Sequence, residues 1–217
     1  MDLLWVIRHT TLANGVAPMP AEVKERSRRN AYYLLFLQYA LLCTLLWVLM
    51  ARYSVSASSI GLSLRHWETF GVIGAVAGTG KLAYSALVTR VLPRPPAGSP
   101  PRYPGVLIGR SGGQEILLLA VSSFVEEFWR AFCLVCFLRL GHGPVFAVVV
   151  TSFAFALAHR EGRDTLVMKV GRVWAHSISG AYYAVFFLWC HSIVVTWVAH
   201  LLYNSVRSYQ ARRTRDA

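Results

Sequence analysis

A chain of 217 residues in which 55% of the side chains are apolar and 15% are charged is too hydrophobic for an ordinary soluble domain. The net charge of +12 does not indicate a nucleic-acid-binding protein, because the 22 lysines and arginines lie in short clusters between apolar runs. We therefore expect an all-α integral membrane protein. Its expected partner is the lipid bilayer, and we expect it to bind no nucleic acid.

The first two apolar segments predict two membrane-spanning helices. Residues 31–50 are almost entirely apolar and follow a basic stretch. Residues 70–91 contain Gly74 and Gly78 in GxxxG spacing, which permits the close approach of another helix within or between chains. Lys81, near the middle of this segment, either lines an internal cavity or extends its amino group toward the membrane surface.

Four further spans are expected after a proline-rich loop, since proline cannot continue a helix. The sequence therefore divides into a basic cytoplasmic N-terminal segment (1–30), two peripheral transmembrane helices (31–92), the loop (93–114), a catalytic four-helix core (115–209) and a basic tail (210–217). Within the core, the predicted spans are 115–138, 145–158, 174–190 and 193–209, with a turn at 139–144 and a polar loop at 160–172.

The positions of the basic residues predict the orientation of this bundle. From residue 21 onward, the segments assigned to the cytoplasmic side carry 16 lysines and arginines, and the segments on the other side carry three. Basic residues that flank spans are retained in the cytoplasm. We therefore predict a polytopic bundle of about six spans with both termini in the cytoplasm, and this pattern favours a bacterial plasma membrane.

Glu126, Glu127 and Arg130 form an ionisable cluster in the middle of the third predicted span. A charged side chain at mid-membrane costs roughly 2.5 to 3.5 kcal/mol on insertion scales, so stability is a poor reason for the cluster. Because Arg130 lies within one helical turn of both carboxylates, it can neutralise one of them and leave the other for chemistry. The alternative is a buried ion pair that locks helix packing.

Two pairs of residues in other spans complete a pattern. His159 lies four residues after Phe155, and Asn204 lies four residues after His200, so each pair shares one face of a helix. An isolated histidine in an apolar helix is usually a packing residue, but the glutamate pair makes a catalytic interpretation stronger. His176, at the start of a span, is interpreted as an interfacial residue.

These residues resemble the motifs EExxxR, FxxxH and HxxxN of the CAAX-processing and bacteriocin-processing (CPBP) intramembrane proteases. The resemblance covers residues 115–207. It implies that Glu126 is the general base that activates water with help from His159, and that His200 and Asn204 hold the oxyanion. It implies no cofactor and a membrane-associated protein or peptide as substrate.

The first motif departs from the family, because only Phe128 and Trp129 separate the glutamate pair from Arg130. An alignment on Arg130 leaves no base in the catalytic place. An alignment on the carboxylates requires Arg130 to pair with Glu127 at i, i+3, and we prefer it. A local bulge in the helix is the other explanation. The separate roles of the two glutamates stay open.

Three functions fit this pattern. The first is a glutamic endopeptidase that needs no metal and hydrolyses a peptide bond of a membrane-associated substrate. The second is a zinc protease with Glu126 or Glu127, His159 and His200 as ligands, although the HExxH motif is missing. The third is an inactive scaffold or a proton-coupled transporter. Prenylated CAAX tails, bacteriocin or pheromone precursors and C-terminal sorting anchors are all compatible substrates.

Overall fold

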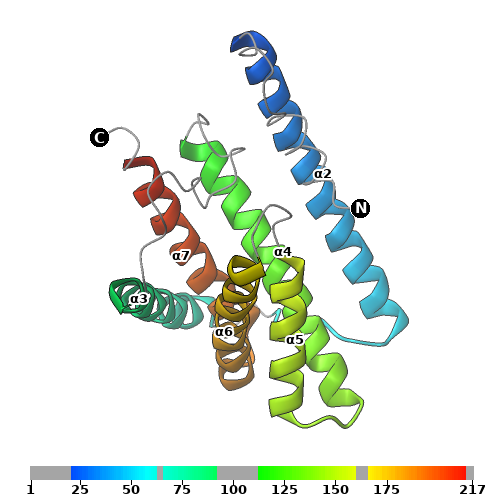
Figure 1. Cartoon of the computed structure of the whole chain (residues 1–217). Helices are drawn as coiled ribbons and strands as arrows, with labels where there is room; N and C mark the ends of the chain where they lie inside the picture. Colours follow the sequence, from blue (N-terminus) through cyan, green and yellow to red (C-terminus); the bar gives the residue numbers. More distant parts are fainter. Residues whose placement is uncertain (1–20, 63–65, 92–111, 160–165, 214–217) are drawn as a thin grey trace.

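The computed structural model of the chain describes residues 21–62, 66–91, 112–159 and 166–213 (Figure 1). These residues form six helices and no strand, which confirms the predicted all-α fold class for them. Residues 1–20, most of the predicted proline-rich loop and residues 214–217 lie outside the described part. The helices are α2 (Ala21–Arg52), α3 (Trp67–Val91), α4 (Gly112–Arg139), α5 (Pro144–Ala158), α6 (Leu166–Cys190) and α7 (Ile193–Arg213).

Several helices extend beyond the apolar segments that predicted them. The largest difference is at α6, which begins at Leu166, so the prediction of a loop up to residue 172 was wrong over this stretch. α2 likewise begins at Ala21 and α7 continues to Arg213. Hydropathy locates only the length that a bilayer would cover, whereas lysine and arginine are good helix formers and continue the backbone hydrogen bonds.

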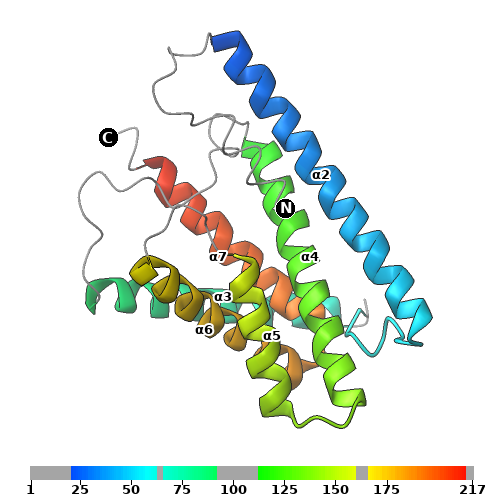
Figure 2. The same ribbon diagram turned by 45° about the vertical axis from the view of Figure 1, so that its right-hand side comes forward.

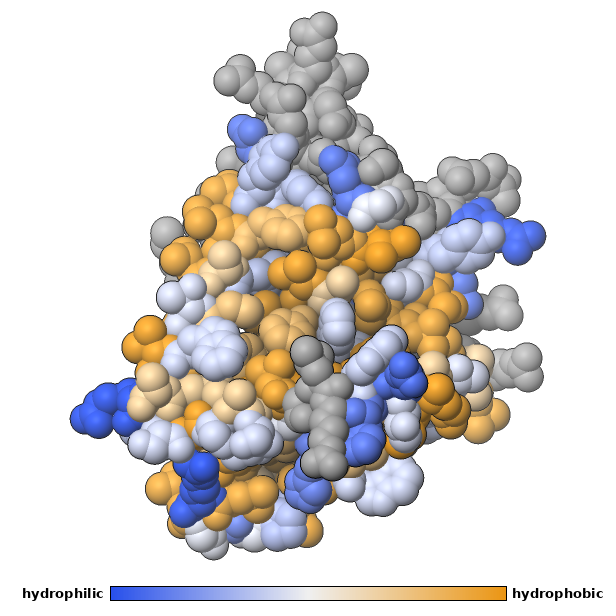
Figure 3. Space-filling model, turned by 180° about the vertical axis from the view of Figure 1, so that it is seen from behind, coloured by the Kyte–Doolittle hydropathy of each residue, from blue (hydrophilic) through white to orange (hydrophobic). Residues whose placement is uncertain are grey.

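The described helices have the apolar surface of a membrane protein. Two segments, Tyr32–Arg52 and Trp67–Leu87, are long and apolar enough to cross a membrane, and Pro144–Ala158 is a shorter apolar helix. Apolar residues cover much of the face in Figure 3, and strongly hydrophilic residues are scattered around its edges and in its lower part. Each of the six described helices exposes large apolar or aromatic side chains; examples, from α2 to α7 in order, are Leu41, Val76, Ile116, Val145, Trp189 and Tyr209.

Helix α4 lies at the centre of the arrangement (Figures 1 and 2). It packs against α2, α5, α6 and α7, whereas α3 packs mainly against α7, and α5 mainly against α6. A central helix contacts its neighbours on several sides. Polar side chains on α4 can therefore meet groups from α5, α6 and α7.

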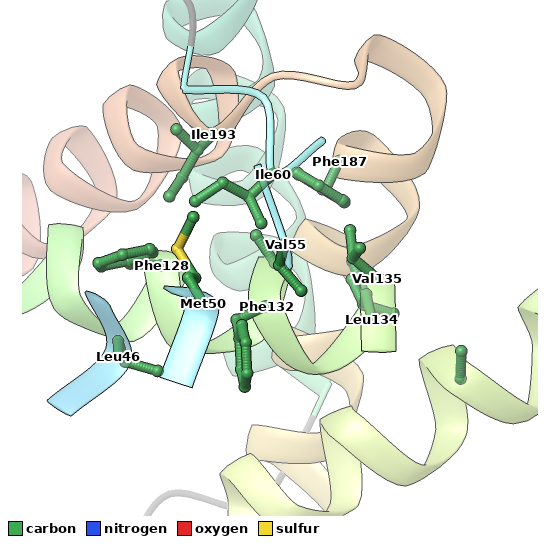
Figure 4. Packing of buried hydrophobic residues seen from close by; sticks show 13 residues of the cluster. Leu46, Met50, Val55, Ile60, Phe128, Phe132, Leu134, Val135, Phe187 and Ile193 are labelled. Carbon is green, nitrogen blue, oxygen red and sulfur yellow. The ribbon is translucent and has the colours of Figure 1, made fainter. Parts of the chain in front are cut away.

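The largest apolar cluster fixes one end of α4 (Figure 4). Phe128 is fully buried in it and follows Glu127 directly, so the glutamates lie beside a tightly packed segment. In lipid, such packing stabilises a bundle through dispersion contacts rather than through the release of water. The other labelled members come from α2, the segment after it, α4, α6 and α7: Leu46, Met50, Val55, Ile60, Phe132, Leu134, Val135, Phe187 and Ile193.

The GxxxG spacing brings α3 into close contact with α7 of the same chain. A Cβ atom placed on Gly74 would lie 2.7 Å from the carbonyl oxygen of Val195, and one on Gly78 would lie 2.9 Å from that of Ala199. Real Cβ atoms essentially never come so near to a backbone oxygen. Since Ala199 precedes His200, this contact sets the distance between α3 and a predicted site residue.

Candidate active site

Glu127 and Arg130 form a buried ion pair within α4. The Nη1 atom of Arg130 donates a hydrogen bond to Oε1 of Glu127, and the side chains of both residues are 1% exposed. Helix α4 is α-helical without interruption from Gly112 to Arg139, so the i, i+3 pairing needs no bulge. The guanidinium carbon of Arg130 also lies 4.3 Å from the centre of the Phe155 ring, which covers it from α5.

His200 of α7 binds the same carboxylate. Its Nδ1 atom lies 2.8 Å from Oε1 of Glu127. Since a carboxylate accepts hydrogen bonds, we assign the proton of this bond to Nδ1. The Nε2 atom then faces Glu126, at 3.7 Å from its Oε2 atom. Glu127 thus fixes the orientation of the imidazole while Glu126 stands at its other nitrogen.

Glu126 differs from Glu127 in both exposure and contacts. Its side chain is 24% exposed, and its Oε2 atom lies 3.7 Å from Nε2 of His159 as well as from Nε2 of His200. Both separations exceed a direct hydrogen bond and suit a shared water molecule or a substrate atom. Glu126 is therefore the carboxylate that can exchange a proton with a bound reactant.

His159 reaches Glu126 because α5 ends at this residue. Proline at the first position starts α5 at Pro144, and His159 is its C-terminal cap, with φ −94° and ψ 12°. Its Nδ1 atom lies 2.8 Å from the carbonyl oxygen of Phe155. A carbonyl oxygen only accepts, so Nδ1 carries a proton, and in the neutral ring Nε2 is an acceptor. His159 is 31% exposed.

Asn204 lies one turn after His200 on α7, and its side-chain nitrogen donates to Oγ of Ser123 at 3.2 Å. Ser123 is fully buried and lies one turn before Glu127 on α4. The structure therefore brings five of the six predicted residues into contact around the two carboxylates. Asn204 follows one helical turn after His200 on α7 and is oriented by Ser123.

Lys81 lies inside the bundle, so of the two expectations for this residue, the one in which its amino group extends to the membrane surface was wrong. The residue is 6% exposed, and its amino group donates to Oγ of Ser179 on α6. It also lies over the ring of Tyr183, 3.8 Å from the centre. The other expectation, that Lys81 lines an internal cavity, agrees with this burial and stays a prediction.

Sequence reasoning missed three neighbours of the site. Tyr183 stacks on His200 with ring centres 4.7 Å apart, His176 stacks on His159 at 4.9 Å, and Ser123 binds Asn204. His176 was interpreted as an interfacial residue, yet α6 places it beside His159. Only Ser123 carried a sequence signal, because it lies four residues before Glu127 and shares its helix face.

The donor atoms bear on the zinc alternative. Within the described ranges, no three His, Cys, Asp or Glu side chains are grouped as a metal-binding cluster. One nitrogen of His159 is bonded to Phe155 and one nitrogen of His200 to Glu127, which leaves a single nitrogen of each ring toward Glu126. This arrangement allows hydrogen bonds to water or a carbonyl group, and histidines that bind a metal have one nitrogen held in the same way, so the bonds of the two rings do not separate the alternatives.

The segment that carries this site is similar to a described protein family. Residues 114–206 match the family described as type II CAAX prenyl endopeptidase Rce1-like. No curated protein and no solved structure matches the chain. The matched segment begins in α4 and ends in α7, and it includes the six predicted residues while leaving out α2 and α3. The resemblance to the CPBP proteases is thereby confirmed.

Proposed function

We propose that the chain is a metal-independent, glutamic-type intramembrane endopeptidase, on the basis of the site geometry and of the family match over residues 114–206, called the Rce1-like segment below. It hydrolyses a peptide bond in a membrane-associated protein or peptide. The observation that carries the proposal is the meeting of three helices at Glu126, where one carboxylate oxygen lies 3.7 Å from a nitrogen of each of two imidazoles. We further propose a multi-pass protein of a bacterial plasma membrane, with both termini in the cytoplasm.

The first step of the proposed reaction is the activation of water. A water molecule between Glu126 and His159 donates one hydrogen bond to Oε2 of Glu126 and the other to Nε2 of His159. Glu126 takes the proton as the water oxygen attacks the carbonyl carbon of the substrate. The electron pair of the carbonyl π bond moves onto its oxygen, which becomes an oxyanion.

The second step stabilises this oxyanion and releases the products. Because Nδ1 of His200 donates to Glu127, Nε2 of His200 is a donor only when the ring is an imidazolium. Glu127 orients the ring through this bond, and Arg130 holds Glu127 in place. Asn204 is the proposed second donor to the oxyanion. When the intermediate collapses, the peptide C–N bond breaks and Glu126 returns its proton to the leaving nitrogen.

The surroundings of the two carboxylates favour Glu126 as the base. Glu127 already accepts hydrogen bonds from Arg130 and His200 and is almost completely buried. A carboxylate in two charge-assisted bonds is a weak base and is inaccessible to water. Glu127 is therefore proposed as the residue that orients His200. The family description makes a prenylated CAAX peptide the first substrate to test.

A cleavage assay tests this proposal. The purified protein in liposomes is incubated with a quenched fluorescent CAAX peptide in prenylated and unprenylated forms. We expect Glu126→Gln to lower kcat by about 100-fold or more, since general-base catalysis contributes that much. Glu68→Gln, at an exposed glutamate in the first turn of α3, is the matched control and should cleave normally.

Two results would contradict the proposal. Cleavage by Glu126→Gln at the rate of the parent would exclude Glu126 as the base. A stoichiometric metal in the purified protein, whose removal by a chelator abolishes turnover and whose return restores it, would favour the zinc alternative instead.

A further inference from the structure

Lys81 is a buried cation outside the Rce1-like segment. It belongs to α3, and its amino group is enclosed by α6 and α7. Besides donating to Ser179, the amino group lies 3.8 Å from the ring centre of Tyr183 and 4.7 Å from that of Tyr203. A lysine amino group so far from solvent is costly unless other groups compensate its charge. Its place therefore calls for an explanation.

The packing of α3 determines where Lys81 lies. Gly78, one turn before it, brings the backbone of α3 against Ala199. The hydroxyl of Tyr182 on α6 donates to the carbonyl oxygen of Ala77 at 2.7 Å. Helix α3 is therefore attached to both α6 and α7 at the level of His200, and Lys81 is held beside the site from two sides.

Tyr183 connects Lys81 to the site. Its ring is fully buried and contacts the amino group of Lys81, and it stacks on the imidazole of His200 with an interplanar angle of 24°. The Tyr183 hydroxyl has no hydrogen-bond partner among the described residues. The ring, rather than the hydroxyl, therefore makes the contacts that matter for His200.

The charges around the site give Lys81 a second role. Two carboxylates, Glu126 and Glu127, lie near one guanidinium on α4, and Lys81 adds a second basic side chain close by. In a medium of low dielectric constant such a balance is worth far more than in water. Apart from the two histidines, Arg130 and Lys81 then give the site one basic side chain for each carboxylate.

We propose that Lys81 is a positioning residue of the active site, acting on His200 through the ring of Tyr183. The cation over the ring holds Tyr183, and Tyr183 fixes the plane of the imidazole, so that Nδ1 faces Glu127 and Nε2 faces the reacting carbonyl group. The part of this inference that concerns turnover rests on the proposed function. The part that concerns the geometry of His200 does not.

The variants separate the contributions of charge, ring and hydroxyl. Lys81→Met keeps most of the side-chain volume and removes the charge, Tyr183→Leu removes the ring, and Tyr183→Phe removes only the hydroxyl. Lys169→Met on α6 and Tyr84→Leu on α3 are matched controls, because Lys169 is partly exposed and Tyr84 is exposed, whereas Lys81 and Tyr183 are buried.

The first measurement needs no substrate. Nitrogen-15 NMR of histidine-labelled protein in detergent reports each imidazole, and the spectrum of His200→Asn identifies the signals of His200. We expect Lys81→Met and Tyr183→Leu to shift these signals, while Tyr183→Phe and both controls leave them in place. Unchanged His200 signals in a folded Lys81→Met protein would overturn the proposal.

The second measurement is the cleavage assay. We expect Lys81→Met to lower kcat about 10-fold with KM unchanged within about two-fold, since a desolvated cation–π contact is worth that much. Equal kcat values for Lys81→Met and Lys169→Met would also overturn the proposal. If the parent protein cleaves no substrate, the proposed function fails, and the NMR result alone decides the role of Lys81.

Discussion

The histidines of the site are defined by what their Nδ1 atoms bind. In His200 this nitrogen donates to a carboxylate, and in His159 it donates to a backbone carbonyl. We propose His200 as a donor to the oxyanion and His159 as an acceptor from water, because His200 binds a charged partner and His159 a neutral one. Two chemically identical side chains are thus suited to opposite tasks by their partners.

The two ring nitrogens of His200 have different partners, which predicts unequal effects of two substitutions at this residue. His200→Gln places an amide donor near the position of Nε2, whereas His200→Asn places one near that of Nδ1. Since removal of an oxyanion donor costs about 100- to 1,000-fold in kcat, we expect the Asn variant to lose that much and the Gln variant about 10-fold. Single-turnover rates on the CAAX peptide check this. Equal losses would argue against an oxyanion role for Nε2.

Breaking the ion pair of Glu127 and Arg130 is predicted to lower the free energy of unfolding strongly. Arg130→Met leaves Glu127 as a buried charge without its main partner, which costs about 3 to 5 kcal/mol. The double variant with Glu127→Gln removes both charges and should recover most of that loss. Denaturant titration in detergent measures the unfolding free energies. A double variant no more stable than Arg130→Met alone would show that the pair is not coupled.

At the scale of helices, the sequence predicted where each helix lies along the chain better than it predicted which helices pack together. Apolar runs located all six described helices, and the spacing of residues along α4 predicted the pair of Glu127 with Arg130. The contact of α3 with α7, by contrast, joins segments more than 100 residues apart, and GxxxG spacing does not say which helix it receives. The positions of Lys81 and Tyr183 beside His200 depend on that contact and could not be read from either segment alone.

The close contact of α3 and α7 predicts different effects of valine at two glycines of one helix. Gly78→Val would place a side chain against the backbone at Ala199, and such overpacking costs about 1 to 3 kcal/mol. Gly71→Val adds the same side chain where a Cβ has no neighbour within 4 Å. We expect a lower thermal unfolding midpoint and lower activity for the first variant alone. Equal midpoints would mean that α3 does not pack as closely as described.

At the scale of the whole molecule, the site is assembled from helices that the chain visits at distant points. Helices α4, α5 and α7 supply the six predicted residues, while α6 supplies the rings that stack on both histidines. The family resemblance located the first group because its motifs have characteristic spacings, although Arg130 lies one residue closer to the glutamates than the family pattern has it. The second group carries no motif, since stacking requires only a flat ring at the right place.

The predicted orientation is testable with single cysteines in a background without the four native ones. Cysteine at position 209, near the end of α7, is expected in the cytoplasm, and cysteine at position 142, in the turn after α4, on the opposite side. Both native residues, Tyr209 and His142, are exposed. A membrane-impermeant maleimide added to intact cells should label position 142 only. Labelling of both positions, or of 209 alone, would contradict the predicted topology.

The contact between Gly78 and the backbone at Ala199 limits what the three motifs alone can say about the activity of a related protein. Position 78 lies outside residues 114–206, yet a side chain there would displace the helix that carries Lys81. A homologous protein can therefore keep every residue of the three motifs and still have lost its function through one change in a helix that the motifs do not cover. Sorting active from degenerate copies by motif alone would misassign it.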